Sequence, residues 1–415
     1  MLTWGDAFCK LDCPMYELTQ PRMANENPVI LLSVRYFFPA YKSGGPVRTL
    51  QAMVENLGAS YQFKIFALDR DDGDPAPFAS IRKDGWNQVG QAQVRYLSPG
   101  WAAPFSLVAL LRKTAFDILY LNSFFDPVFT LAPLLARRCR LIPAKPVVVA
   151  PRGEFSAGAL AQKPFKKSVF LKLDQLLGLY KNTTLHASTE LEKGEIQNAL
   201  GRRGRDNPRV RVALNMSLNR ADEIHSRGKA KVPGKLNAVF ISRVAAKKNL
   251  LAAIEIMAAV KGDVSFHIFG PVRDLNYWEK CQRAIEQCGA SVRVEYKGAL
   301  AHEKVLATLA GYDAFILPTL GENFGHVILE SLLAGCPVVI SDQTPWRGLC
   351  EKKAGWDLAL AAQERFVEAL QKVAEMDDET HRVWREGARA LGLAAAQDAR
   401  VLDNNKKLFI DLPET

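Results

Sequence analysis

The segment from residue 318 to residue 342 constrains the fold of this chain more than any other stretch. It reads PTLGENFGHVILESLLAGCPVVISD and follows a short apolar run, Ala314 to Leu317. This run and a second one, Pro337 to Ile340, are typical of buried strands, and the stretch from His326 to Ala334 is typical of a helix. The order strand, turn, helix, strand predicts one half of a doubly wound α/β domain.

The turn in this segment, Gly321 to Gly325, is suited to binding an anion. It places free backbone N–H groups at the N-terminus of the predicted helix, where a phosphate is stabilised. Two carboxylates accompany it, Glu322 in the turn and Glu330 on the helix, in the pattern E-x7-E. A carboxylate beside an anion site is costly unless it bonds another group, and sugar hydroxyls are natural partners.

These residues carry a resemblance to a known family. The E-x7-E spacing and the ENFG turn resemble those of the retaining nucleotide-sugar glycosyltransferases of family 4, also called group 1, which have the GT-B fold. The resemblance covers most of the chain, about residues 28 to 410. It implies that Glu322 contacts the donor sugar, that Glu330 binds the nucleotide ribose, and that the turn residues between them also bind the donor: Asn323, Phe324, Gly325 and His326.

The whole chain has the rhythm of a two-domain α/β protein. Its 415 residues exceed one typical core. Apolar runs alternate with helical stretches, which predicts parallel sheets covered by helices. Together with the resemblance, this predicts a GT-B architecture: two doubly wound, Rossmann-like domains face each other across a cleft, and the C-terminal helix returns to the first domain. Strands are expected at 29–34, 63–67, 94–97, 118–121, 147–150, 184–187, 210–213, 238–242, 265–269, 292–296, 314–317 and 338–340.

Domain boundaries are expected where this rhythm breaks. Residues 1–27 lack periodicity and the apolar core of a secretory signal, which predicts a disordered leader with Met23 as an alternative start. The remaining parts are an acceptor-binding domain at 28–218, a linker at 219–235, a donor-binding domain at 236–395 and a helix at 396–415 that packs on the first domain.

Two cations bracket a strand-to-helix turn in the second half. Arg243 and Lys248 lie in the run ISRVAAKKNL, and such cations can clamp a diphosphate. The family has an R-x4-K element here, so the resemblance assigns both residues to the departing diphosphate, in the role that a metal has in other transferases. We therefore expect no metal and no cofactor. The acidic run Asp69 to Asp74 could hold a metal, but an acidic surface loop is the favoured interpretation.

Glycines and one aromatic residue complete the expected donor site. Gly44 and Gly45 let the backbone approach a ligand closely, and the resemblance places this loop opposite the donor phosphate. Tyr296 follows from the family's base-binding segment, with Gly270 near it. Nothing in these residues distinguishes uridine from guanosine, so the donor is expected to be a UDP- or GDP-sugar.

The chain departs from the family pattern at Arg152, where many relatives have a histidine that contacts the donor sugar. Arginine cannot act as a base near neutral pH, so its role stays open between binding a phosphate and binding an anionic sugar. The neighbouring Glu154 is expected to bind the acceptor. A salt-bridged loop is the alternative for both residues.

The positive charge of the chain lies in its first half. Residues 1–216 hold 28 Lys and Arg against 18 Asp and Glu, whereas residues 217–415 hold 26 of each. A basic amphipathic helix is predicted at 162–179, which suits an anionic membrane and its lipid-linked acceptors. The expected contacts are Lys163, Phe165, Lys166 and Lys167. An ordinary helix with its apolar face in the core is the alternative.

The expected function is the transfer of a hexose-type sugar, with retention, to a lipid-linked or polysaccharide acceptor in surface-glycan synthesis. Scattered cysteines and the absence of a 20-residue apolar run indicate a cytoplasmic protein, at most peripheral to the inner face of the membrane. A nucleotide-sugar epimerase of the same fold is the nearest alternative. A basic nucleic-acid-binding protein is another, although no stacking aromatics accompany the basic stretch and no nucleic acid is expected. No G-x-G-x-x-G supports a dehydrogenase.

Overall fold

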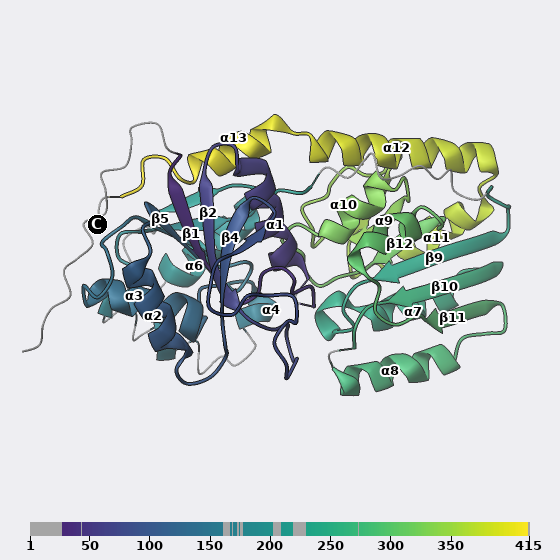
Figure 1. Cartoon of the computed structure of the whole chain (residues 1–415). Helices are drawn as coiled ribbons and strands as arrows, with labels where there is room; N and C mark the ends of the chain where they lie inside the picture. Colours follow the sequence, from purple (N-terminus) through teal and green to yellow (C-terminus); the bar gives the residue numbers. More distant parts are fainter. Residues whose placement is uncertain are drawn as a thin grey trace, which may run out of the picture.

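The computed structural model contains two α/β domains, each built on its own sheet (Figure 1). It describes residues 27–42, 44–160, 167, 169–171, 174, 177–201, 209–218, 230–272 and 274–413. Residues 1–26 of the predicted leader and residues 219–229 of the predicted linker lie outside these residues. Both sheets are parallel apart from one edge pair, and helices cover their faces, as the alternation of apolar runs and helical stretches predicts.

The first sheet has eight strands in the order β3-β4-β2-β1-β5-β6-β7-β8. All pairs are parallel except β3 with β4. The strands are β1 (Val29–Ser33), β2 (Gln62–Leu68), β3 (Asn87–Val89), β4 (Ala92–Leu97), β5 (Ile118–Asn122), β6 (Val147–Ala150), β7 (Thr183–Ala187) and β8 (Val210–Val212). The helices are α1 (Gly45–Leu57), α2 (Ala103–Lys113), the π-helical turn η1 (Pro127–Leu131), α3 (Ala132–Arg138), α4 (Ala157–Leu160) and α6 (Glu190–Gly201).

The second sheet has six parallel strands in the order β11-β10-β9-β12-β13-β14. They are β9 (Lys235–Ile241), β10 (Asp263–Phe269), β11 (Val292–Tyr296), β12 (Ala314–Leu317), β13 (Val338–Ser341) and β14 (Gly355–Leu358). The helical elements between and after them are η3 (Ala246–Lys248), α7 (Leu250–Ala258), α8 (Leu275–Glu286), η4 (His302–Lys304), α9 (Val305–Leu309), α10 (His326–Leu333) and α11 (Gln363–Glu375).

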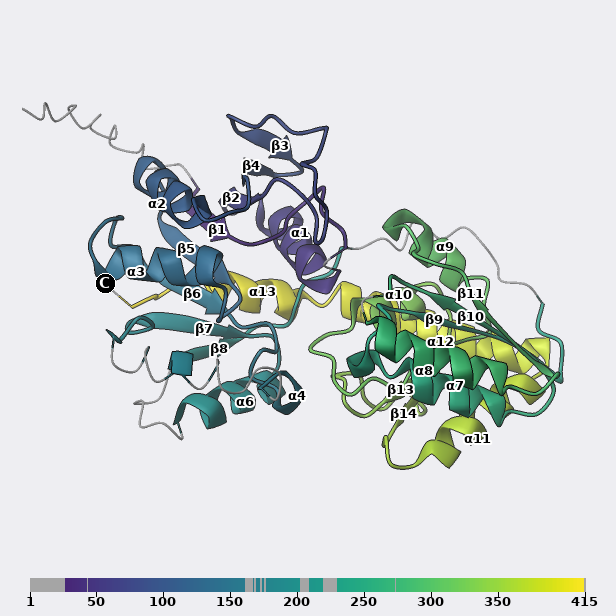
Figure 2. The same cartoon turned by 90° about the horizontal axis from the view of Figure 1, so that it is seen from below.

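Two helices at the end of the chain join the domains. The long α12 (Asp378–Ala396) packs along α10 in the second domain, and α13 (Ala399–Lys407) lies against α1 in the first. Figure 2 shows both helices, in yellow, running from one domain to the other. Leu408 and Phe409 complete the core of the first domain. The predicted return of the last helix is therefore confirmed.

Every strand predicted from an apolar run is present, within a few residues at its ends. Two strands were not predicted, β3 and β14. The three residues of β3 are partly or fully exposed, so no apolar run marks them. β14 begins at Gly355, where any side chain would overlap the backbone of Val338 in the neighbouring strand. Glycine is unfavourable in most strands, and this contact explains its presence here.

Candidate donor site between the two domains

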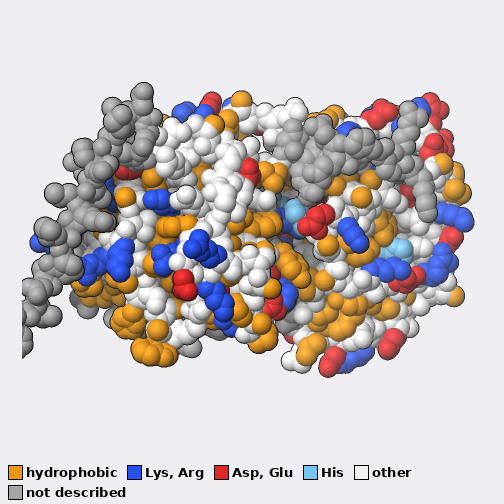
Figure 3. All heavy atoms as spheres, in the orientation of Figure 1, with side chains coloured by type: hydrophobic (Ala, Val, Ile, Leu, Met, Phe, Trp, Pro, Cys, Tyr) orange, Lys and Arg blue, Asp and Glu red, His pale blue; other side chains and the backbone are white. Residues whose placement is uncertain are grey.

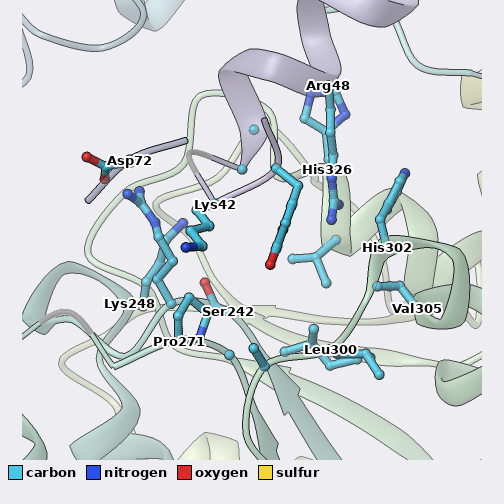
Figure 4. Close-up of a pocket in the computed structure, with 18 of the residues that line it drawn as sticks. Lys42, Arg48, Asp72, Ser242, Lys248, Pro271, Leu300, His302, Val305 and His326 are labelled. Atoms are coloured by element: carbon cyan, nitrogen blue, oxygen red, sulfur yellow. The ribbon is translucent and has the colours of Figure 1, made fainter. Parts of the chain in front are cut away.

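The candidate site is a cavity of about 470 Å³ between the two domains. The N-termini of α1 and α10 both border it, so two sets of free backbone N–H groups serve one cavity. Figure 4 shows side chains from both domains that point into it. Nine predicted residues line it: Gly44, Gly45, Arg243, Lys248, Gly270, Glu322, Gly325, His326 and Glu330.

The two predicted cations come from the segment that follows β9. Lys248, at the end of η3, forms an ion pair with Glu322, and each side chain is less than one-sixth exposed. Arg243 lines the same cavity and is exposed to it. The pairing holds Glu322 and Lys248 together at one wall of the cavity. The arrangement suits the stabilisation of a departing phosphate by fixed cations.

The predicted ribose residue, Glu330, is held from the opposite domain. Arg48 Nη1 donates to both carboxylate oxygens of Glu330, at 2.8 Å and 3.0 Å. His302 Nδ1 lies 3.6 Å from Oε1 of the same carboxylate. Sequence reasoning missed both Arg48 and His302. Arg48 lies in the first turn of α1, shortly after Gly44 and Gly45. This closeness to the predicted glycine loop could have identified it as a site residue.

His326 is a neutral contact between α10 and α1. Its Nε2 lies 2.8 Å from the Thr49 hydroxyl, and its ring lies edge-on to Phe324. Burial lowers the pKa of His326 to about 3, and the nearby charges of Arg48 and Arg152 add to this effect. The imidazole is therefore uncharged at neutral pH. In this form one ring nitrogen donates a hydrogen bond and the other accepts one.

The acidic run after β2 supports the glycine loop. Asp71 Oδ2 accepts hydrogen bonds from the backbone N–H groups of Tyr41 and Lys42, at 2.7 Å and 3.0 Å. Asp74 forms an ion pair with the Lys42 ammonium group, and both Asp72 and Asp74 line the cavity. The acidic run is a loop that is partly exposed, and it also has a structural role. Its carboxylates hold the loop that faces α10.

Gly270 lies where two loops approach closely, at a φ of 140°. A side chain there would overlap the backbone of Ser242. Tyr296 does not line the cavity: its hydroxyl donates to the Gly270 carbonyl at 2.8 Å, and its ring packs against Trp278. The side chains at this end of the cavity are instead Pro271, Val272 and Leu300, and they make an apolar wall suited to a base.

Two residues of the predicted turn face away from the cavity. The Asn323 amide contacts Gly153, where a side-chain carbon would lie 2.6 Å from Oδ1. Phe324 borders a second cavity, of about 190 Å³, beside Trp346 and the start of α13. Its carbonyl accepts the indole N–H of Trp346 at 2.6 Å. These contacts fix the turn in place, whereas Gly325 lines the donor cavity itself.

Arg152 lies behind the donor cavity and does not line it. It adopts a φ of 56° and donates to Asn122 at 2.9 Å, Asn215 at 2.5 Å and the Tyr120 hydroxyl at 2.7 Å. All three partners are neutral, so these contacts are hydrogen bonds and not the salt bridges that the alternative interpretation expects. The guanidinium is close enough to His326 to lower the pKa of that imidazole.

Glu154 is bound by the loop after β5. Its carboxylate accepts from the Ser123 hydroxyl at 2.7 Å and from the backbone N–H of Phe124 at 2.5 Å, and burial raises its pKa. Lys167 donates to the Ala159 carbonyl at 2.6 Å, and its ammonium lies 5.1 Å from the centre of the Phe125 ring. Lys163, Phe165 and Lys166 lie outside the described residues.

Two features are absent from the part of the chain that the structure describes. Within that part of the chain, no group of three or more His, Cys, Asp or Glu side chains is placed to hold a metal ion. Among the same residues, no helix is both long and apolar enough to cross a membrane.

Comparisons with known proteins agree with this geometry. Residues 222–391 match the family model "Glycosyl transferases group 1". A 2-deoxystreptamine N-acetyl-D-glucosaminyltransferase of Niallia circulans is 26% identical over 117 residues, which are 28% of this chain and 29% of the relative. The match to this curated relative thus spans less than a third of its length.

Solved structures match over nearly the whole chain. Anabaena HepE, in complex with UDP and glucose, has a TM-score of 0.63 and 17% identity, covering 92% of this chain and 98% of its own. WaaG, a glycosyltransferase involved in lipopolysaccharide biosynthesis, has a TM-score of 0.61 and 14% identity, covering 92% and 99%. The second domain therefore matches the group 1 glycosyltransferases, and the chain as a whole has the GT-B fold of these solved structures.

Proposed function

We propose that this protein is a retaining, metal-independent transferase that moves a hexose-type sugar from a nucleoside-diphosphate sugar to a lipid-linked or polysaccharide acceptor. One observation carries the proposal. Arg243 and Lys248 come from one segment of the second domain, Glu322 and Glu330 come from another, and all four converge on one cavity between two helix N-termini. Cations and N–H groups suit the diphosphate, and the carboxylates suit sugar and ribose hydroxyls.

The chemistry assigned to this site needs no enzyme nucleophile. The bond between the anomeric carbon and the donor phosphate breaks, and a bond from that carbon to the acceptor oxygen forms on the same face. The acceptor proton passes to the departing phosphate. Arg243 and Lys248 stabilise the negative charge that develops there, and Glu322 orients the sugar. The metal-free mechanism is consistent with two fixed cations at the phosphate position.

Similar proteins support the choice of donor and acceptor. The Anabaena structure contains UDP and glucose, which favours a UDP-sugar as the donor. WaaG is involved in lipopolysaccharide biosynthesis, which favours a surface glycan as the product. We place the protein in the cytoplasm, in peripheral contact with the inner face of the membrane, because the excess positive charge lies in its first 216 residues.

The first test is a thermal-shift panel of nucleoside diphosphates and their sugars, with NAD and single-stranded DNA included. A ligand that binds only the folded state raises the unfolding midpoint. We expect one nucleotide series to raise it in the wild type and to lose most of that effect in Arg243→Ala. A shift with DNA alone would overturn the proposal in favour of a nucleic-acid-binding protein.

The second test separates transfer from epimerisation. With the donor that the panel identifies, we expect release of the nucleoside diphosphate to depend on an acceptor, and Glu322→Gln to lose turnover by about a hundredfold or more while its unfolding midpoint is unchanged. Conversion of the donor to an epimer without acceptor would support the epimerase. Wild-type turnover in Glu322→Gln would remove that residue from the mechanism.

A further inference from the structure

The helix α2 exposes large apolar side chains on the surface of the first domain. Trp101, just before the helix, is 87% exposed, and Phe105 in its first turn is 71% exposed. Both side chains are therefore largely open to solvent at the start of this helix. Leu107 and Leu111, further along the helix, are fully buried in the core. The exposed pair therefore contributes nothing to that core.

Basic residues accompany this apolar surface, and the segments that form it contain no acid. Residues 99–116 and 127–146 have no Asp or Glu. Arg112 and Lys113 are exposed at the end of α2, and Arg138 and Arg140 are exposed at the end of α3, which packs beside α2. Figures 1 and 2 show α2 and α3 side by side, and Figure 3 shows hydrophobic side chains in this region with Lys and Arg near them.

A groove beside α2 contains further basic residues, and it lies between this surface and the loop that reaches the donor cavity. It has a volume of about 500 Å³, lies between β4 and α2, and is lined by the cations Lys83, Arg95 and Lys113. Two acids also line it. Asp69 is paired with Arg70 and accepts a hydrogen bond from Ser98, which leaves Asp84 against three cations. Asp69 begins the loop whose later residues line the donor cavity.

We propose that the face formed by α2 and α3 docks on an anionic lipid bilayer, with Trp101 and Phe105 inserted among the headgroups and the four exposed cations contacting lipid phosphates. Aromatic side chains favour the interfacial region, and each nearby Lys or Arg adds electrostatic attraction to anionic lipid. This surface differs from the basic helix predicted at 162–179. Docking itself does not depend on the proposed function. The proposed function gives it a purpose, because a membrane-bound acceptor would then enter beside the donor cavity.

The test measures cosedimentation of the full chain with vesicles made of equal parts of phosphatidylglycerol and phosphatidylcholine. We expect the double variant Trp101→Ser, Phe105→Ser to lose at least about tenfold in vesicle affinity. The matched control is Leu275→Ser on α8 of the second domain, because Leu275 is also 71% exposed. This control should bind vesicles as the wild type does.

Charge is tested separately with a second matched pair. Arg112→Glu with Lys113→Glu should weaken binding to the anionic vesicles, and added salt should weaken wild-type binding as well. Lys280→Glu with Arg283→Glu on α8 changes the charge equally and should have no effect. Unfolding midpoints of all variants check that the fold is intact.

Three results would overturn the inference. The first is wild-type vesicle binding by the Trp101 and Phe105 double variant, and the second is an equal loss in the Leu275 control. The third is a change of oligomeric state in the double variant without vesicles, because the face would then bind a second copy of the chain. The thermal shift with nucleotides is a separate readout. If only the docking proposal fails, this shift remains; if only the donor proposal fails, the shift is absent and vesicle binding is unchanged.

Discussion

Two histidines show how strongly single residues in this protein depend on their surroundings. His186 Nε2 donates to the Ala213 carbonyl, its Nδ1 lies 2.8 Å from the Tyr120 hydroxyl, and burial lowers its pKa to about 3. His326 has the same depressed pKa beside α1. Both side chains are neutral in the folded protein across the physiological range. In the unfolded chain they titrate near the ordinary value of 6.5.

This difference predicts a loss of stability in mild acid. As the pH falls below 6.5, the unfolded chain binds protons that the folded protein does not bind until about pH 3, so the free energy of unfolding falls with pH in that window. The slope approaches about 1.4 kcal/mol per pH unit for each histidine. Urea unfolding at pH 7.5 and pH 5.5 measures it, and His186→Gln should flatten the dependence. Equal stability at both values would contradict the pKa of both groups.

Among the site residues that the sequence did not predict, we expect Arg48 to matter most for donor affinity. Arg48→Ala removes the cation that holds Glu330 across the cleft, which should raise the KM for the donor by about tenfold. Steady-state kinetics with varied donor checks this. Arg70→Ala is the control, because Arg70 pairs with Asp69 within the first domain and does not line the cavity. An unchanged KM in Arg48→Ala would show that the ion pair has no role in binding.

At the scale of elements, the contact between α10 and α12 depends on the absence of a side chain. Gly392 is buried in α12, and a side-chain carbon there would lie 2.6 Å from the backbone nitrogen of Leu333 in α10. The two helices can therefore approach each other more closely than side chains would allow. Since α10 carries Glu330 and His326, this contact helps to position the donor site.

Gly392→Val should separate α10 from α12 and lower the free energy of unfolding by about 1–3 kcal/mol, as overpacking does. Gly194→Ala in α6 is the matched control, because nothing lies within 4 Å of a side-chain carbon at that position. The control should be neutral or stabilising by up to about 1 kcal/mol. Chemical denaturation measures both variants. Wild-type stability in Gly392→Val would mean that the helices can separate without cost.

At the scale of the whole molecule, the last two helices return the chain to the domain where it began. Asn405 in α13 donates to the Leu214 carbonyl at 2.8 Å, and the Phe409 ring lies 5.4 Å from that of Tyr61. Together with the ion pair between Arg48 and Glu330 and the contact between Thr49 and His326, these contacts join the two domains.

Phe409→Ala should lower the free energy of unfolding of the first domain by about 3 kcal/mol, because it leaves a cavity in that core. The ring is 7% exposed, whereas the adjacent Ile410 is 49% exposed, so Ile410→Ala is the matched control and should have little effect. Thermal unfolding of both variants measures the difference. Equal midpoints would show that the returning chain end adds little to the first core.

Features that depend on neighbouring residues could be predicted from the sequence, whereas contacts between residues far apart in the chain could not. Apolar runs such as Val147–Ala150 predict buried strands because burial needs only local composition. The motif residues Glu322 and Glu330 were found from spacing along one turn and helix. Arg48 was missed because its partner lies 282 positions away, and Tyr296 was misplaced because only packing shows that its hydroxyl turns to Gly270.

The sequence by itself determined the two α/β domains, the order of their strands along the chain and the segments that carry the donor residues, because these follow from periodicity and local spacing. Only the tertiary structure decided which side chains meet. It paired Arg48 with Glu330 across the domains, put the acidic loop at Asp71 under the glycine loop, and left Trp101 and Phe105 uncovered. These contacts depend on how two separately folded sheets are placed against each other, and no local pattern in the chain encodes that placement.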